Sequence, residues 1–76
     1  MEIYQIKHFI AIVETGSFTK GADRAAVTQS TISISIAKLE AEFGVQLLKR
    51  RSPVVPTSAG SVWSKSAGQF YSYAVR

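Results

Sequence analysis

The chain has 76 residues, with nine Lys and Arg against five Asp and Glu, one His and no Cys. A chain of this length buries only about 60% of the surface that it exposes when unfolded, which leaves room for one small domain. The lack of cysteine excludes a disulfide framework and a thiolate metal site, and a single histidine cannot assemble a metal site alone. We therefore expect neither a metal nor a cofactor in this domain.

Neither a secretion signal nor a membrane span is visible in the sequence. Charged side chains and His8 interrupt the apolar residues of the first twenty positions. Nowhere does an apolar run reach the length of about 18 residues that a spanning helix needs. The sequence thus predicts a cytoplasmic protein without a membrane partner.

The basic balance is the first positive indication of a partner. A net charge of +4 and a pI of about 9.8 suit a polyanion, provided that the charge gathers on one face. The only basic run is Lys49-Arg50-Arg51. It is a candidate for a phosphate or minor-groove contact, although a solvated basic turn explains an isolated triplet equally well.

Two helices are predicted at the start of the chain, over residues 3–14 and 19–26. Apolar residues of the first recur at spacings of three and four, at Ile3, Ile6, Phe9, Ile10 and Val13. Gly16 can close this helix in the left-handed conformation, and Ser17 or Thr19 can cap the second. The second helix is expected to turn small side chains inward, namely Ala22, Ala25 and Ala26.

A third helix is predicted over residues 29–43, because the Thr28 hydroxyl can cap its start and Gly44 can close its end. Its buried stripe is expected at Ile32, Ile36, Leu39 and Phe43. The short connection from the second helix favours a sharp helix-turn-helix corner. On the opposite face lie Ser30, Ile34, Ala37 and Ala41, flanked by Gln29 and Ser33.

This opposite face is small and uncharged, whereas an ordinary solvent-facing helix surface carries Glu and Lys. It is therefore expected to lie against something. The residues alone leave three alternatives open, which are more core, a protein interface and the major groove of DNA. In the groove, a Gln amide can pair with adenine, a Ser hydroxyl can bind a base edge or a phosphate, and an apolar side chain can contact the thymine methyl.

Residues 45–56 are predicted to form a two-stranded wing, since apolar and polar residues roughly alternate around the break at Ser52-Pro53. Thr57 can cap a fourth helix. Its apolar positions are Trp63, Ala67, Phe70 and Ala74. The predicted fold is mainly α with a small β wing, with a winged helix-turn-helix domain at residues 1–57 and the start of a linker helix at 58–76.

Groups suited to catalysis are scarce. Glu40 and Glu42 are two apart on a helix and face different directions, which predicts a solvated face. His8 has no acidic residue at helical spacing, so a Ser-His-Asp arrangement is not expected and His8 is interpreted as an ordinary surface or half-buried residue. The glycines form no phosphate-cradling cluster. An enzyme is therefore not predicted.

About a dozen positions resemble, in spacing and in type, the N-terminal domain of LysR-type transcriptional regulators. They are Gly16-Ser17-Phe18-Thr19, Ala22, Val27-Thr28-Gln29-Ser30, Ile32-Ser33, Ile36, Leu39-Glu40, Phe43-Gly44, Leu47-Leu48, Arg50 and Thr57-Ser58-Ala59-Gly60. The resemblance implies sequence-specific binding of double-stranded DNA, with residues 29–43 in the major groove and residues 45–56 on the backbone or minor groove. A ligand-sensing domain follows in family members, so an effector is expected only through that domain, which this chain lacks.

The residue pattern and the resemblance together give the expected DNA-binding residues. They are Thr28, Gln29, Ser30, Thr31, Ser33, Ile34, Lys38 and Arg51. The resemblance also implies that Arg50 anchors the wing. Ile34 and Ser35 stand where the family usually carries Arg or Lys and Gln or His, so contact of Ile34 with a thymine methyl is expected instead. Gly21 replaces the usual Ala and is expected to cost up to about 1 kcal/mol of helix stability; Ala25 replaces the usual Leu and thins the core.

The fourth helix has two possible uses. Its aromatic residues could complete the core, as Trp63 is placed to do, or they could pair with a second copy. Because the aromatic side chains spread around the helix, we expect a homodimer or a higher oligomer. The expected dimerisation residues are Trp63, Phe70, Tyr71 and Tyr73. The competing function is a winged-helix module that binds another protein.

Overall fold

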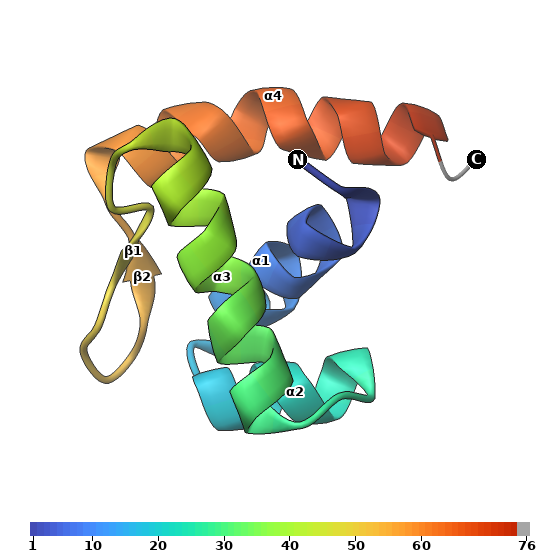
Figure 1. Ribbon diagram of the computed structural model, residues 1–76. Coiled ribbons are helices and arrows are strands. Elements are labelled where there is room, and N and C mark those ends of the chain that lie inside the picture. Colours follow the sequence, from blue (N-terminus) through green and yellow to red (C-terminus); the bar gives the residue numbers. More distant parts are fainter. Residues whose placement is uncertain (75–76) are drawn as a thin grey trace.

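The computed structural model consists of four helices and one short hairpin (Figure 1), and it describes the backbone of residues 1–74 and the side chains of residues 1–69. The elements are α1 Ile3–Thr15, α2 Phe18–Ala25, α3 Gln29–Phe43, β1 Leu48–Lys49, β2 Val55–Pro56 and α4 Ser58–Ala74. The predicted fold, mainly α with a small β wing, is confirmed.

The helix ends lie at the residues whose chemistry predicted them. Gly16 closes α1 and Gly44 closes α3, both with left-handed φ angles of 70° and 68°. The Ser17 side chain caps α2 by accepting a hydrogen bond from the Lys20 amide, and Thr28 caps α3 by accepting from the Thr31 amide at 3.1 Å. Local capping therefore sets where α3 begins and ends.

The core lies between the first three helices, and the hairpin and α4 close its remaining side. Its buried members are Phe9, Ile12, Ala22, Ile32, Ile36, Leu39, Leu47, Leu48 and Val54. Trp63 from α4 packs edge-on against Phe9, with 4.8 Å between ring centroids. In Figure 1, α4 runs along the side of the molecule where α3 ends, while α2 lies near the start of α3.

Three residues that were predicted to be buried are exposed instead. Ile3 is 42% exposed because it is the first residue of α1, before the packed stripe begins at Ile6. Phe43, also 42% exposed, is the last residue of α3 and reaches the core only through an edge contact with Trp63. Ala26 takes a left-handed φ of 60° as the C-cap of α2, so its methyl group leaves the inward face.

Two glycines permit close approaches between elements. A Cβ atom on Gly21 would lie 2.9 Å from Ile12 Cγ1 and 3.0 Å from Ile12 Cα, so the glycine lets α2 pack directly on α1. A Cβ atom on Gly60 would overlap the carbonyl oxygen of Leu47, where α4 meets the segment that leads into the hairpin. Gly21 therefore lowers the helix propensity of α2, but the close packing of α2 on α1 requires it.

The hairpin is antiparallel, with Leu48 opposite Pro56 and Lys49 opposite Val55. The Val54 amide donates to the Gly16 carbonyl at 2.8 Å, which fixes the hairpin to the turn between α1 and α2. None of the helices in the part of the chain that the structure describes is long and apolar enough to span a membrane.

Candidate nucleic-acid interface

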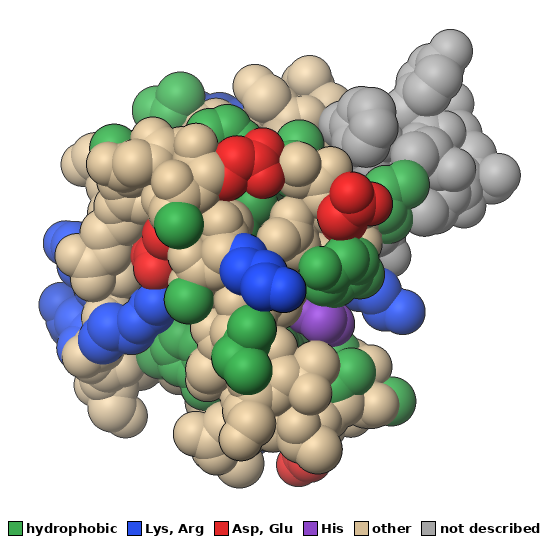
Figure 2. Space-filling model, viewed as in Figure 1, with side chains coloured by type: hydrophobic (Ala, Val, Ile, Leu, Met, Phe, Trp, Pro, Cys, Tyr) green, Lys and Arg blue, Asp and Glu red, His purple; other side chains and the backbone are tan. Residues whose placement is uncertain are grey.

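The outer face of α3 is exposed, as its composition predicted. Ile34 is 57% exposed, and a shallow hollow beside it is lined by Gln29, Ser30, Ser33 and Ile34. In Figure 2 much of the surface over α3 is uncharged or hydrophobic, although a basic side chain lies beside it and acidic side chains lie near its upper end, whereas other Lys and Arg side chains gather at the side where the hairpin lies in Figure 1. The arrangement separates an uncharged helix face from a basic wing.

A small polar network surrounds the first turn of α3. Thr28 Oγ1 accepts from the Thr31 amide and donates to Thr31 Oγ1 at 2.9 Å. The Thr19 hydroxyl of α2 donates to Gln29 Oε1 at 3.1 Å. This second bond orients the Gln29 amide from a neighbouring helix. The pattern of residues on α3 does not indicate that Thr19 of α2 binds Gln29.

The wing is joined to α3 through Glu40. One carboxylate oxygen accepts hydrogen bonds from the Leu47 and Leu48 amides at 2.7 and 3.2 Å, and the other accepts from Arg50 Nη2 at 2.7 Å. The prediction that Glu40 lies on a solvated face is therefore wrong, because two backbone amides of the wing and one guanidinium require its oxygens.

Arg50 and Arg51 have different surroundings. The Arg50 guanidinium lies 4.8 Å from the centroid of the Phe18 ring while it pairs with Glu40, so it holds α2, α3 and the wing together. The predicted anchoring role of Arg50 is confirmed. Arg51 is exposed in the turn of the hairpin. None of the ion pairs found among the described residues involves Arg51.

His8 lies beneath α3 and not at the surface. It is 5% exposed, its ring stacks edge-on with Tyr4, and its Nδ1 atom lies 2.9 Å from the hydroxyl of Ser35, which is itself 3% exposed. The prediction of a surface or half-buried histidine is therefore wrong. Burial, with a smaller contribution from the charge of Lys7, lowers the pKa of His8 below 6.5.

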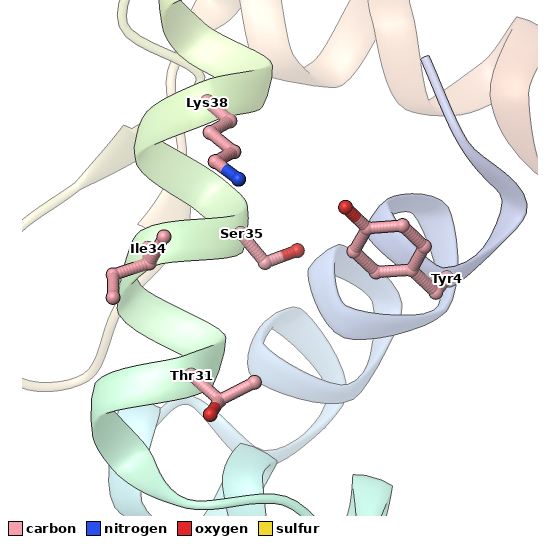
Figure 3. Close-up of a pocket in the computed structure, with 5 residues that line it drawn as sticks. All are labelled: Tyr4, Thr31, Ile34, Ser35 and Lys38. Carbon is pink, nitrogen blue, oxygen red and sulfur yellow. The ribbon is translucent and has the colours of Figure 1, made fainter.

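A second hollow lies between α1 and α3, lined by Tyr4, Thr31, Ile34, Ser35 and Lys38. In Figure 3 the Tyr4 hydroxyl and the Lys38 ammonium point into it, the Ser35 hydroxyl points toward α1, and Ile34 points away. Thr31, Ile34 and Lys38 were expected at the interface, whereas Tyr4 was not. Position 4 has no special spacing relative to α3, and only the packing of the two helices brings it there.

The comparison with family models gives one match, over residues 3–61, which is described as "Bacterial regulatory helix-turn-helix protein, lysR family". The match covers all three core helices and the wing. The chain belongs to the lysR family.

Relatives of this LysR-family domain are regulators of transcription. The chain is 42% identical over 77 residues to the HTH-type transcriptional regulator BenM of Acinetobacter baylyi, covering 100% of this chain and 23% of BenM. It is also 42% identical over 64 residues to AlsR of Bacillus subtilis, covering 83% of this chain and 21% of AlsR. The chain thus spans about a quarter or less of the length of these two relatives.

The fold is also that of LysR-family structures. The BenM_DBD/benA site 1 DNA complex has a TM-score of 0.91 at 40% identity, covering 97% of this chain and 84% of that one. The CbnR_DBD-DNA complex has a TM-score of 0.91 at 36% identity, covering 97% and 86%. A full-length BenM mutant has a TM-score of 0.93 at 39% identity, covering 97% and 25%.

The expected dimerisation face of this LysR-family domain is only partly described. Trp63 is half-buried between Phe9 and Phe43, so it completes the core. The side chains of Phe70, Tyr71 and Tyr73 lie outside the described residues. The exposed residues of α4 include Val62, which is 71% exposed.

Proposed function

We propose that this chain is the DNA-reading head of a LysR-type transcriptional regulator, which binds double-stranded DNA sequence-specifically with α3 in the major groove and the wing on the backbone or minor groove. The observation that carries this proposal is the uncharged, exposed face of α3 beside a basic wing. The BenM and CbnR domains that share its fold were solved as DNA complexes.

The two parts of the interface have separate tasks in this proposal. Gln29, Ser30, Ser33 and Ile34 line the hollow that faces the base edges, where amide, hydroxyl and methyl groups can distinguish base pairs. Arg51 of the wing, together with Thr28, Thr31 and Lys38, supplies phosphate contacts, which position the domain without reading sequence. Specificity therefore comes from α3, and much of the affinity comes from the basic side chains around it.

Further parts of the proposal concern the whole regulator. Pairing of α4 with a second copy would place two α3 helices on half-sites about one helical turn, or a multiple of a turn, apart. A small-molecule effector would act through a domain that lies outside this chain. The domain itself is proposed to work without a cofactor, as a binding protein and not an enzyme, and in the cytoplasm, where bacterial DNA is found.

The experiment that tests the proposal is binding to a pool of random-sequence duplexes, followed by fluorescence anisotropy over a series of salt concentrations. We expect the logarithm of affinity to fall linearly with the logarithm of salt concentration, by about 0.9 for each phosphate contacted. The competing function, a winged-helix module that binds another protein, predicts no such binding. The absence of salt-dependent DNA binding would therefore overturn the proposal.

The variant Arg51→Ala adds a check on the wing. It should weaken binding to all sequences alike and reduce the salt slope by about 0.9, because a phosphate contact releases one counterion. Arg24→Ala is the matched control, since Arg24 is an exposed arginine that pairs with Glu14 on the α1–α2 side of the domain. A loss confined to selected sequences would assign Arg51 to base reading instead.

A further inference from the structure

We infer that Tyr4, Thr31 and Lys38 form a binding pocket for one DNA phosphate, to which α1 contributes the Tyr4 hydroxyl. The inference rests on the proposed function and adds to it a contact from outside the helix-turn-helix and the wing. The pocket has a volume of about 180 Å³ and lies between α1 and α3, directly beside the exposed Ile34. It borders on the face proposed to read the bases.

The position of the pocket follows from the size of the groove. An α-helix with its side chains is about 10–12 Å wide, and the major groove of B-DNA is about 12 Å wide. A helix lying in the groove therefore turns its outer face to the bases and its two flanks to the two phosphate strands. One flank of α3 faces the wing. The other flank carries Thr31 and Lys38 and faces Tyr4 of α1. The pocket is the counterpart of the wing on the other flank.

The chemistry of the lining suits a phosphate oxygen. The Lys38 ammonium and the Tyr4 hydroxyl are both hydrogen-bond donors and point into the same space (Figure 3). Thr31 completes the lining with its methyl group turned toward α1 in Figure 3, while its hydroxyl is hydrogen-bonded to Thr28. No carboxylate lines the pocket, and the ion pairs found among the described residues do not involve Lys38. An anion would thus meet donors and one positive charge.

Tyr4 is held in place by the core beneath it. Its ring stacks edge-on with the buried His8 ring at a centroid distance of 5.6 Å, and the Nδ1 atom of His8 is bonded to Ser35 on α3. Tyr4 itself is 47% exposed, so its ring is fixed on one side while its hydroxyl faces the solvent. A donor held in this way loses little conformational entropy when it binds an oxygen.

The test uses Tyr4→Phe and Lys38→Gln in the 76-residue chain, with random-sequence duplexes about 30 base pairs long, or three helical turns, as the probe. Tyr4→Phe keeps the ring on His8 and removes only the hydroxyl. We expect a dissociation constant raised about tenfold with an unchanged salt slope, because the lost hydrogen bond to a charged group releases no counterion. Lys38→Gln should also weaken binding and should reduce the slope by about 0.9.

A double-mutant cycle separates a shared phosphate from two unrelated effects. If both side chains hold one phosphate, Tyr4→Phe should weaken the Lys38→Gln variant much less than it weakens the wild type. Lys7→Gln is the matched control. Lys7 is an exposed lysine of α1, but it lines a different hollow, between α1 and α2. Unchanged urea midpoints for Tyr4→Phe would exclude a loss of folding as the cause.

The outcomes distinguish the inference from the proposed function. If the wild type binds DNA and the Tyr4→Phe variant binds it equally well, the pocket is overturned and the proposed function stands. Fully additive effects of Tyr4→Phe and Lys38→Gln also overturn it, since they mean separate sites. A wild-type chain that binds no duplex overturns both proposals. A tenfold, salt-independent loss with strong coupling to Lys38 supports the pocket.

Discussion

The Arg50 guanidinium donates a hydrogen bond of 2.7 Å to Glu40, and the second oxygen of the same carboxylate accepts the Leu47 and Leu48 amides. The Glu40 side chain is only 15% exposed, against 41% for Arg50. Its removal would leave two wing amides without a partner in a poorly hydrated position. The Glu40 carboxylate therefore stabilises the fold more through its hydrogen bonds to the two backbone amides than through the partly exposed ion pair.

We accordingly predict that Glu40→Ala lowers the free energy of unfolding by about 2–3 kcal/mol, the cost of unpaired buried amides. Urea denaturation followed by circular dichroism measures it. Glu42→Ala is the matched control, because Glu42 is 44% exposed and should change stability by less than about 0.5 kcal/mol. Equal effects of the two substitutions would show that Glu40 does not hold the wing.

Gly21 and Gly68 provide a second matched pair, in which the same substitution should change the free energy of unfolding in opposite directions. An alanine at either position gains up to about 1 kcal/mol of helix propensity. At Gly21 the new methyl group would press on the Ile12 backbone, and overpacking of this kind costs roughly 1–3 kcal/mol. Nothing lies within 4 Å of the equivalent position at Gly68.

Gly21→Ala should therefore lower the free energy of unfolding by roughly 1 kcal/mol, while Gly68→Ala raises it by a similar amount. Thermal and urea denaturation of both variants check this. A stabilising Gly21→Ala would show that α2 can move away from α1 at little cost.

The bounds of α3 could be predicted from the sequence because its end signals are local. Thr28 caps the amide three residues on, and Gly44 closes the final turn, so neither depends on the rest of the fold. The exposed face of α3 could be predicted for the same reason: the helical period fixes which residues lie opposite the buried stripe, and Ile34 does lie there.

The roles of Glu40, His8 and Tyr4 could not be predicted in this way. A helical period gives the direction of a side chain but not what lies across from it. Glu40 meets amides seven and eight residues on, where the chain enters the hairpin, and His8 meets Ser35, which lies 27 residues away on another helix. Tyr4 is directed to its hollow by the packing of α1 on α3, which no local motif encodes.

His8 should make the stability of the domain depend on pH. Burial and Lys7 lower its pKa in the folded domain below the 6.5 of the unfolded chain, so the unfolded state binds the proton more readily. Stability should be constant with respect to His8 above about pH 6.5 and should decrease as the pH falls below it, until the folded state is also protonated.

Urea midpoints at about pH 7.5 and pH 5.5 measure this change for the wild type and for His8→Gln. The glutamine can still bond to Ser35 but does not titrate in this range, so the variant isolates the contribution of His8 from that of the carboxylates. If both proteins lose the same stability on acidification, His8 is not held in its neutral form by the fold.

Thr19 should affect base reading through Gln29. Thr19→Val keeps the shape of the side chain but removes the hydroxyl that donates to Gln29 Oε1. On a site selected from a random pool, we expect the dissociation constant to rise several-fold, equivalent to about 1 kcal/mol, with little change on random DNA. Gln29→Ala should cost about 1–3 kcal/mol on the selected site.

Combining the two substitutions tests the route of this effect. Thr19→Val should add little to Gln29→Ala, because the amide that Thr19 orients is then absent. Equal losses on selected and random duplexes would instead assign Thr19 and Gln29 to backbone contacts.

Ile34 provides the most direct measure of how α3 meets DNA. An arginine at this 57% exposed position would add a phosphate-binding charge to a hollow whose other lining residues are uncharged. Ile34→Arg should therefore bind duplexes more tightly and less selectively, with a salt slope steeper by about 0.9. It should also lose the apolar contact with the thymine methyl, so discrimination between selected and random sites should fall even as affinity rises.

Glu14→Gln is the control for Ile34→Arg, because Glu14 is 59% exposed and pairs with Arg24 on the α1–α2 side of the domain, away from α3 and the wing. It changes the net charge equally but should leave the salt slope close to that of the wild type. An unchanged slope for Ile34→Arg would mean that position 34 does not face the duplex, and α3 would then have to meet DNA through a different face or not at all.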